Sequence, residues 1–369
     1  MGFSVLSTFG EERDRWFSYI ERLEPRSRDI HFLPEYGQIY QKTYGYEPFL
    51  ACYEDGEDFV IQPYVKRPLG GLPFLKEQDG RERYFDIANA YGHGGPLAQC
   101  NDPDRAPQLL LEYDRRFTAY CAENKIAAEF TSLHPLLERQ RLFLNLGLVS
   151  GTRQKEIVYV DLTGPEEEIW AGLRKDRKNS IKKARKNGVS VEKVELTPEN
   201  LGVFNKLYYR TMERNGAADR WYFPEGYFKD SHEQLGKERV SLFVAYVGTA
   251  PAAACILMHA FDTIYYHFTG SDERFFSYGA ISLMVYEVAL WARQEGYLRF
   301  FLGGGVSSSP QDSLFMFKSG FSKKTAPLFT YGRVHHKETY EHLCAIKREH
   351  EKMTLGTEIE SDYFPLYRR

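Results

Sequence analysis

The sequence predicts a mixed α/β protein made of two duplicated lobes, each with one mixed sheet flanked by helices. Three observations support this fold class. A chain of 369 residues is too long for one ordinary hydrophobic core. Apolar runs with the two-residue spacing of strands alternate along the chain with runs that have helical spacing. The order of these elements in the first half returns in the second half, which indicates an internal repeat.

The first half is expected to contain a helix, a hairpin, a strand that enters a glycine-rich turn, a long helix, a strand, a short helix and a closing strand. The hairpin is predicted because the polar turn at 54–57 separates two β-rich runs. The elements are predicted, in order, at 34–45, 48–53 with 58–68, 84–97, 104–124, 126–133, 136–146 and 156–162.

The second half is expected to repeat this order behind a long basic helix. Three glutamates after Pro165 suit the start of that helix, and Asn187 followed by Gly188 suits its end. The elements are predicted at 165–187, 189–196, 198–216, a meander of 241–247, 252–261 and 263–271, then 279–297, 298–304, 313–320 and 326–335. The lobes are therefore predicted at 1–162 and 163–340, with a helical tail at 341–369.

Composition and charge exclude several classes of protein. The net charge of −3 argues against bulk electrostatic binding to DNA or to anionic lipid. The five cysteines are scattered and form no CxxC pair, which argues against a zinc site and against a disulfide framework. The N-terminus lacks the pattern of a signal peptide, and the apolar run 240–260 is broken by a turn at Gly248 to Pro251. We therefore expect a cytoplasmic protein with no membrane span and no bound metal.

The strongest local pattern is a strand, a short polar turn and a long apolar helix within 263–297. The turn contains Ser277, Tyr278, Gly279, Ala280 and Ile281. Small residues at a helix N-terminus let backbone N–H groups face outward, where they can hold a pyrophosphate or another anion. The alternative is a tight connection between strand and helix that binds no ligand.

This strand–turn–helix–strand order, with Arg274, Gly279 and Ala280 at the turn, resembles the acyl-donor core of the GNAT superfamily. Three motifs are similar to a narrower group, the Fem-type aminoacyltransferases that build peptidoglycan bridges, and their two-lobed relatives. They are LRKDRKNSIKKARKNGVSV, AYGHGGPL, and YHFTGSDERF continuing to FKSGF. The resemblance implies tandem GNAT-like lobes, with the acceptor side in the first lobe and the donor turn in the second.

The resemblance also implies a chemistry, in which an amine of a cell-envelope sugar, sugar nucleotide or peptide attacks an activated carbonyl directly. The donor is then acyl-CoA or aminoacyl-tRNA, used as a co-substrate, and no cofactor stays bound. Direct attack suits a sequence without a nucleophile elbow or an evident Cys/His pair. Catalysis would rest on positioning and on oxyanion stabilisation.

Three residues are candidates for catalysis. Lys318 in FMFKSGF corresponds to a lysine near the transferred carbonyl, although a lysine at a helix end also complements the helix dipole. Tyr266 and His267 lie on the strand that enters the turn, with side chains on opposite faces. His267 is either a general base or a structural histidine. Phe317 beside Lys318 is either a pocket wall or a core residue.

Four residues are candidates for holding the acceptor. Tyr209, Arg210 and Arg214 resemble a family helix that contacts the acceptor, and the two arginines stand one turn apart, where they can clamp one anion. Solvent-facing helix arginines are the alternative. Tyr91 in AYGHGGPL either lines the cleft between the lobes or serves only the turn.

The basic run between 174 and 186 is dense enough to contact a phosphate backbone, so tRNA is a possible donor partner. A solvated helix surface would carry the same charges. The run comprises Arg174, Lys175, Arg177, Lys178, Lys182, Lys183, Arg185 and Lys186. Two other functions stay open: a two-lobed protein that binds a glycan or peptide without catalysis, and an RNA-binding module.

Overall fold

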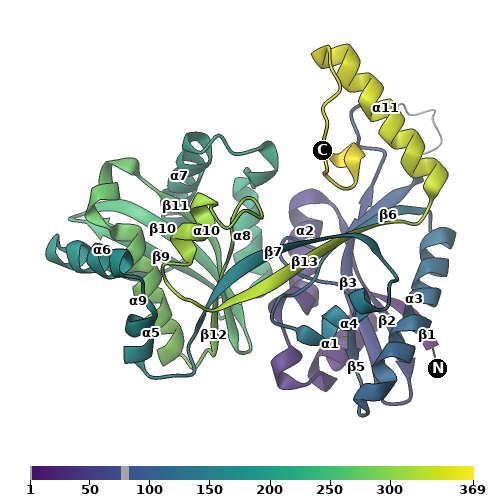
Figure 1. The fold of residues 1–369 in the computed structure, drawn as a ribbon, viewed down its shortest axis with the longest axis horizontal. Coiled ribbons are helices and arrows are strands. Elements are labelled where there is room, and N and C mark those ends of the chain that lie inside the picture. The colour runs from purple at the N-terminus through teal and green to yellow at the C-terminus, as the bar shows by residue number, and fades with distance from the viewer. Residues whose placement is uncertain (1, 76–82) are drawn as a thin grey trace. The chain divides into compact units, whose positions relative to one another are not determined.

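The computed structural model describes residues 2–75 and 83–369, which form two compact units (Figure 1). Unit 1 comprises Met1–Gln154 and Leu328–Arg369, and unit 2 comprises Lys155–Pro327. Within the described residues, no helix combines the length and the apolar character needed to cross a membrane.

Unit 1 has a mixed sheet with the strand order β1-β2-β3-β4-β6-β13, and β5 pairs with β3. Only the β4–β6 pair is parallel among the described pairings of this unit. The strands are β1 (Gly2–Ser7), β2 (Glu47–Asp55), β3 (Asp58–Pro68), β4 (Phe85–Ala88), β5 (Leu97–Gln99), β6 (Ile126–Ser132) and β13 (Thr325–Val334).

Helices cover both faces of this sheet because β2 is apolar on both sides. Ala51 and Tyr53 pack in the core cluster beneath α3, while Pro48 faces Gly37 of α2. The helices are α1 (Gly10–Arg22), α2 (Pro34–Tyr44), α3 (Ala106–Glu123), α4 (Arg141–Asn145) and α11 (Lys337–Leu355).

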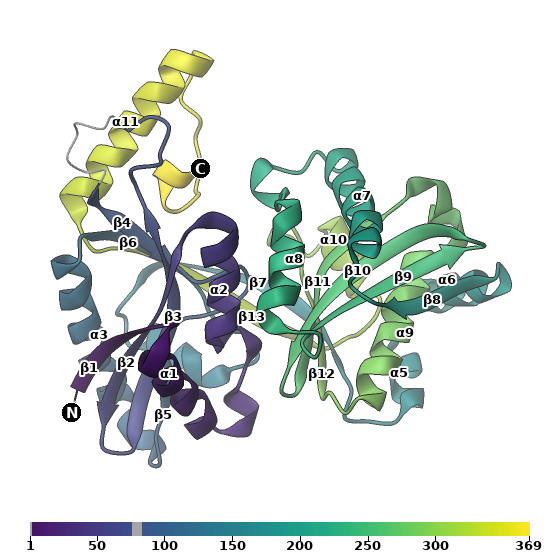
Figure 2. The ribbon, with the colours of Figure 1, turned by 180° about the vertical axis from the view of Figure 1, so that it is seen from behind.

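Unit 2 has the strand order β7-β12-β11-β10-β9-β8, and here only β11–β12 is parallel. Helix α9 packs on one face of β8, β9 and β10, while α7 packs against β10 and β11 (Figure 2). The strands are β7 (Ser150–Asp161), β8 (Val189–Val194), β9 (Val240–Val247), β10 (Ala250–Ala260), β11 (Thr263–Ser271) and β12 (Arg299–Gly304). The helices are α5 (Glu166–Gly172), α6 (Lys175–Lys186), α7 (Pro198–Arg214), α8 (Glu225–Leu235), α9 (Ala280–Gln294) and α10 (Ser313–Lys318).

The predicted fold class is confirmed, because the two units repeat one strand order with one parallel pair at the same place. One detail differs from the prediction. The strand beside β6 is β13 rather than β7, and the strand beside β12 is β7 rather than β13. The two units therefore exchange their closing strands. Residues 328–340, which the sequence assigns to the second lobe, belong with unit 1.

Buried side chains explain why β13 joins unit 1. Glu129 of β6 accepts hydrogen bonds from Tyr331 at 2.9 Å and from Gln62 at 2.7 Å, and it lies 3.2 Å from the ring of His335. Arg333 pairs with Asp114 of α3. A buried carboxylate needs such partners, and the alternation of apolar residues along a strand does not reveal which neighbour supplies them.

Two helix predictions also need correction. The single helix predicted at 165–187 is two helices, since the backbone of Leu173 and Arg174 is extended and buries Leu173 in the core. Helix α8 falls in a stretch for which no element is predicted, as do β1 and α1. Helix α8 packs Tyr227 and Phe228 around Phe268 of β11.

Candidate active site

The candidate site of unit 2 begins where β11 and β12 separate. Their parallel pairing covers only Thr263 to Tyr265 against Arg299 to Phe301, although β11 continues to Ser271 and β12 to Gly304. The pairing of β10 with β11 passes from Tyr266 to Phe268, so His267 is an extra residue in a β-bulge. Strands that part at their carboxyl ends leave room for a ligand between them.

The bulge decides where Tyr266 and His267 lie. Tyr266 packs in the core cluster beneath α9, and its hydroxyl donates to Thr269 Oγ1 at 2.8 Å. Burial raises the pKa of Tyr266 far above its ordinary value, so the phenol stays neutral. The ring of His267 lies edge-on to Phe268 at 4.4 Å. Neither residue lines the cleft described below, and their catalytic roles stay predictions.

The predicted donor turn lies at the N-terminus of α9. Gly279 has the left-handed backbone angle φ = +79°, and a Cβ placed on it would lie 2.5 Å from the carbonyl oxygen of Ser180 in α6. A glycine is therefore required by both the turn and the close approach of α6. No side chain caps the first turn of α9 in the described part of the chain, which leaves its N–H groups available to a ligand.

This turn borders a cleft of about 360 Å³ within unit 2. Gly279, Ala280 and Ile281 line it, whereas Ser277 and Tyr278 of the predicted turn do not. The walls come from α6, from the ends of β10 and β11, from the 3-10 turn at 273–278 and from α10. The remaining lining residues are Arg177, Ser180, Ala252, Ser271, Asp272, Phe275, Phe276, Ser282 and Phe317.

Arg177 of α6 brings a cation to the cleft. It donates to Ser282 Oγ at 3.3 Å and lies 4.9 Å from the centre of the Phe317 ring. A Cβ on Gly320 would lie 2.7 Å from Arg177 Cγ, so the glycine of the FKSGF motif lets the end of α10 approach α6. A helix N-terminus and a guanidinium that face one cleft together favour an anion. Phe317 lines the cleft. Its predicted contact with an acceptor stays a prediction.

The sequence predicts Arg177 as one member of the basic run, either in contact with a phosphate backbone or on a solvated helix surface. Its position on α6 gave a signal, since Arg177, Ile181 and Ala184 follow helical spacing and the last two are fully buried. An arginine on the buried side of a helix contacts other parts of the protein as well as solvent.

The arginines of α7 reach the rim of the same cleft. Arg214 donates to the carbonyl oxygen of Ser271 at 3.1 Å and lies 4.8 Å from the centre of the Phe276 ring. Arg210 lies 3.4 Å from Asp272, and its side chain is 49% exposed. The hydrogen bonds of Arg274, which also holds Asp272, keep the pKa of that carboxyl below its ordinary value. The Arg214 side chain is thus bound to the end of β11, whereas about half of the Arg210 side chain is exposed to solvent.

Tyr209 lies away from this rim. Its hydroxyl donates to the carbonyl oxygen of Phe223 at 2.5 Å, which fastens α7 to the segment before α8. The contact gives Tyr209 a structural role in this unit, and its predicted contact with an acceptor stays a prediction.

Lys318 ends α10 on the side of β12. Its Nζ donates to the carbonyl oxygen of Gly304 at 2.8 Å, and it is not among the residues that line the cleft. Burial and the nearby ammonium of Lys155 lower the pKa of Lys318 to about 7, against the opposing charge of Asp312. The amine therefore lies against the turn after β12, in a partly buried position, and not in the lining of the α9 cleft.

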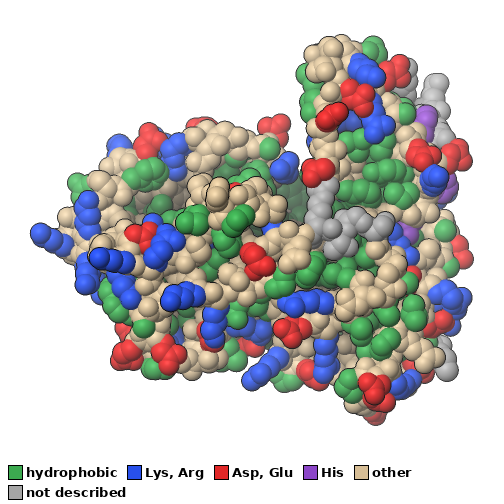
Figure 3. Space-filling model, in the orientation of Figure 1, with side chains coloured by type: hydrophobic (Ala, Val, Ile, Leu, Met, Phe, Trp, Pro, Cys, Tyr) green, Lys and Arg blue, Asp and Glu red, His purple; other side chains and the backbone are tan. Residues whose placement is uncertain are grey.

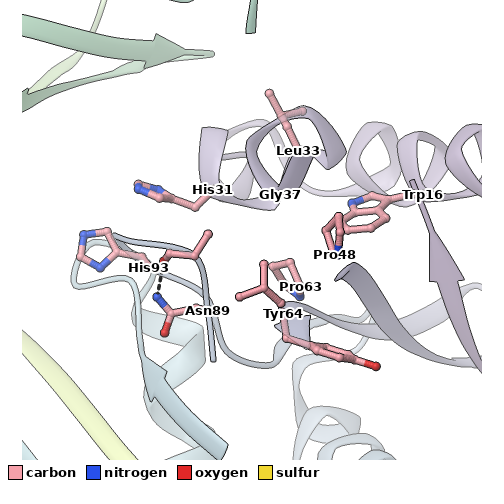
Figure 4. A pocket seen from close by; sticks show the side chains of 11 residues that line it. Trp16, His31, Leu33, Gly37, Pro48, Pro63, Tyr64, Asn89 and His93 are labelled. Carbon is pink, nitrogen blue, oxygen red and sulfur yellow. Dashed lines mark hydrogen bonds between the residues drawn. The ribbon is translucent and has the colours of Figure 1, made fainter. Parts of the chain in front are cut away.

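Tyr91 belongs to unit 1 and follows Ala90, one of the residues that line the small cavity shown in Figure 4. Its N–H donates to the hydroxyl of Tyr40 at 2.6 Å, and burial raises its pKa to about 12. A Cβ on Gly92 would lie 2.1 Å from His31 Nε2, so the AYGHGGPL turn packs directly on that histidine. The cavity, with a volume of about 10 Å³ and His31 and His93 among its lining residues, has room for roughly one water.

The described residues contain no group of three or more His, Cys, Asp or Glu side chains arranged to hold a metal ion.

Comparison with known proteins agrees with this geometry. Residues 171–309 match the acetyltransferase (GNAT) domain family, a span that contains α6, β11, the Gly279 turn and α9. The UDP-N-acetylmuramoylpentapeptide-lysine N(6)-alanyltransferase of Weissella viridescens is 26% identical over 305 residues, which cover 78% of this chain and 86% of that protein. The chain is thus an acyltransferase with a GNAT domain in its second half, and it is similar to a Fem-type enzyme.

Solved structures show the same fold in other proteins. A crystal structure of FemX matches with a TM-score of 0.66 and 14% identity, covering 92% of this chain and 99% of that one. A protein of unknown function from Bacteroides thetaiotaomicron matches with a TM-score of 0.54 and 13% identity, covering 89% and 99%. As an N-acyltransferase of this kind, the enzyme takes its acyl group from an acyl-CoA or an aminoacyl-tRNA.

Proposed function

We propose that this acyltransferase moves an aminoacyl group from tRNA to a side-chain amine of a muramoyl-peptide precursor of the cell wall. The acceptor is inferred from the Weissella viridescens relative, which is an alanyltransferase for the lysine of UDP-N-acetylmuramoylpentapeptide. The match covers 86% of that protein. Little of the relative lies outside the match, so we assign its activity to the matched region.

The observation that carries the proposal is the cleft at the N-terminus of α9. Uncapped N–H groups of the first turn and the guanidinium of Arg177 face the same space of about 360 Å³. Both possible donors carry their acyl group on a phosphate-bearing nucleotide, so an anion site beside an open space suits either.

The surface of α6 favours tRNA over CoA. Lys175, Lys182 and Lys183 are exposed on the helix whose Arg177 lines the cleft. Lys and Arg side chains gather over α6 in Figure 3. A row of cations that leads to the donor site can follow the repeated phosphates of a tRNA backbone. A single CoA carries its phosphates on one nucleotide and cannot extend along the helix in this way.

The chemistry needs no covalent enzyme intermediate. The acceptor amine attacks the ester carbonyl, and the tetrahedral intermediate releases the tRNA hydroxyl. Lys318, which follows the cleft-lining residue Phe317 at the end of α10, supplies a positive charge to the oxyanion or to the leaving oxygen when it is protonated. Arg210, with its free surface at the cleft rim, holds an anionic group of the acceptor, and Arg214 supports it by fixing Ser271. Phe317 forms the cleft wall beside Arg177.

The test is a transfer assay with two donors and one acceptor, read by mass spectrometry of the product. Alanyl-tRNA or a bulk mixture of aminoacyl-tRNAs is compared with acetyl-CoA, with UDP-N-acetylmuramoylpentapeptide as acceptor. Aminoacylated product from tRNA alone supports the proposal. Acetylated product from acetyl-CoA alone would transfer the donor assignment to CoA, and no product from any donor would overturn the proposed function.

Arg177→Met tests the cleft itself. Loss of one charge-assisted hydrogen bond to a phosphate should weaken donor binding by roughly 10-fold to 100-fold, equivalent to about 1.5–3 kcal/mol. Lys175→Met is the comparison, because it removes one exposed charge of the proposed tRNA path outside the cleft and should weaken donor binding less than Arg177→Met. Equal losses in the two variants would mean that Arg177 acts only through the general charge of α6.

A further inference from the structure

Phe276 is a large apolar side chain that stays exposed where it lines the cleft at the N-terminus of α9. It lies in the 3-10 turn between β11 and α9, and 52% of the residue is exposed. Its neighbour Phe275 packs against the core cluster of unit 2, as does Tyr278, whose ring lies 5.8 Å from that of Phe275. Single exposed apolar residues are common on proteins, so exposure alone assigns no role to Phe276. The groups around its ring are what distinguish it.

A fixed arginine supports the Phe276 ring. The guanidinium carbon of Arg214 lies over this ring, 4.8 Å from its centre, which is within the range of a cation–π contact. Arg214 donates hydrogen bonds to the carbonyl oxygen of Ser271 at 3.1 Å, to Ser271 Oγ at 3.3 Å and to Thr211 Oγ1 at 3.4 Å. Because the guanidinium covers one face of the ring and half of the residue is exposed, the opposite face is open to a ligand. The ring is in place before a ligand binds, which lowers the entropy lost on binding.

The ring stands beside an anion site. Gly279, three residues after Phe276, precedes the first turn of α9, and the guanidinium of Arg177 lines the same cleft of about 360 Å³. This combination suits a nucleotide. A base stacks on an aromatic ring, while its phosphate oxygens accept hydrogen bonds from backbone N–H groups and from a guanidinium.

The two acids of this turn are paired with arginines. Asp272 lies 2.6 Å from Arg274, and Glu273 lies 3.9 Å from Arg214. The side chain of Arg274 is 70% exposed, so it adds a cation close to Phe276 in the chain. A phosphate that approaches the ring therefore meets positive charge, which a purely apolar wall for an acyl chain would not need.

We propose that Phe276 is a stacking platform for an unpaired base at the 3′ end of the RNA donor, and that Arg214 is the positioning residue that holds the ring. The proposal rests on the proposed function, in which tRNA is the donor, and adds the part of the tRNA that the cleft recognises. Stacking uses the flat face of a base and reads none of its edges, so the platform selects a single-stranded end and not a sequence. The phosphates next to that base then lie at the N-terminus of α9 and at Arg177.

The test measures binding of RNA to the full-length protein and needs no acyl transfer. The probe is a fluorescently labelled hairpin RNA with an unpaired ACCA 3′ end, and binding is followed by fluorescence anisotropy. In matched probes one nucleotide of this end at a time is abasic, so that the phosphates stay and one base is lost. For the wild type, one abasic position should weaken binding by roughly 5-fold to 100-fold, the usual effect of one base–aromatic stack.

Variants of Phe276 show whether its ring makes that contact. Phe276→Ala should weaken binding of the intact probe by about as much, and the abasic nucleotide should then cost no further affinity. Phe276→Trp should restore both effects. Arg214→Met should reduce the cost of the abasic nucleotide, because the ring loses its support, and Arg214→Lys should regain part of it. Phe261→Ala is the matched control, since Phe261 is 43% exposed between β10 and β11 and does not line the cleft; this variant should bind every probe like the wild type.

An abasic cost that stays the same in Phe276→Ala, or that is absent from the wild type at all four positions, would overturn the platform. An unchanged abasic cost in Arg214→Met would overturn the positioning role. A parallel titration with UDP separates the donor from a nucleotide-linked acceptor. If Phe276→Ala lost affinity for UDP and not for the RNA, the assignment to the donor would be wrong.

The proposed function has a separate outcome. Absence of transfer with every donor would contradict that function, and the comparison of intact and abasic RNA would still decide the role of Phe276. If Phe276→Ala fails to fold, Phe276→Leu carries the same comparison.

Discussion

Gly279 offers a sharp test of how the donor turn is built. Gly279→Ala adds a Cβ to a left-handed residue, which costs about 1–2 kcal/mol, and places it 2.5 Å from the carbonyl oxygen of Ser180. That distance is shorter than any real Cβ contact, so α6 must move, and overpacking of this kind costs about 1–3 kcal/mol more. We expect the free energy of unfolding of unit 2 to fall by about 2–5 kcal/mol.

Gly296→Ala separates the two contributions. Gly296 is also left-handed, at φ = +86° just beyond the other end of α9, but a Cβ there meets nothing within 4 Å. It should lose only the backbone term of about 1–2 kcal/mol. Urea unfolding followed by tryptophan fluorescence reports on this unit, because Trp170, Trp221 and Trp291 lie in it. Equal losses in the two variants would refute the view that α6 requires a glycine at position 279.

Two further predictions concern buried ionisable groups. Lys318→Met should raise the thermal midpoint below pH 7, because the folded pKa of Lys318, about 7, lies below the unfolded value of about 10.4 and protonation therefore favours the unfolded chain. The gain in thermal midpoint should shrink as the pH rises toward 10. Turnover of the same variant should fall by about 10²-fold or more. Lys175→Met is the control, and a gain that does not depend on pH would contradict this reasoning. Glu129→Gln should destabilise the protein by about 3 kcal/mol near pH 7. Burial opposes the charge of Glu129, but His335, Arg333 and Gln62 outweigh it and hold its pKa at about 2, so its contribution is present above about pH 4.3 and disappears as the pH falls toward 2. A difference between Glu129→Gln and wild type that persists at pH 2, measured by urea unfolding, would argue against this assignment.

Much of the fold could be predicted because local patterns decide it. The hairpin of β2 and β3, the meander of β9 to β11 and the long helix α9 all lie where periodicity and turn residues indicate them. The exchange of β7 and β13 could not be predicted in this way. Both strands alternate apolar residues, and their neighbours are chosen by contacts over long sequence separation, such as Tyr331 with Glu129.

The site shows the same limit at the level of single residues. The sequence indicated the turn at Gly279, because small residues before an apolar helix form a local pattern. It did not indicate that Arg177 shares the cleft, or that Lys155 lies beside Lys318, because each contact joins elements more than 100 residues apart. It also left open that Arg214 is bound to Ser271.

The charge of the chain and the charge of its cleft need not agree in sign. The net charge is −3, which predicts no general attraction for nucleic acid. In unit 2, however, Arg174 and Arg177 share Asp176, and Arg210 and Arg274 share Asp272, so the arginines around the cleft outnumber the carboxylates that they hold. Carboxylates held by arginines add little negative potential to that space, so the local field stays positive. We therefore expect the proposed anionic donor to stay bound at a salt concentration where bulk RNA dissociates.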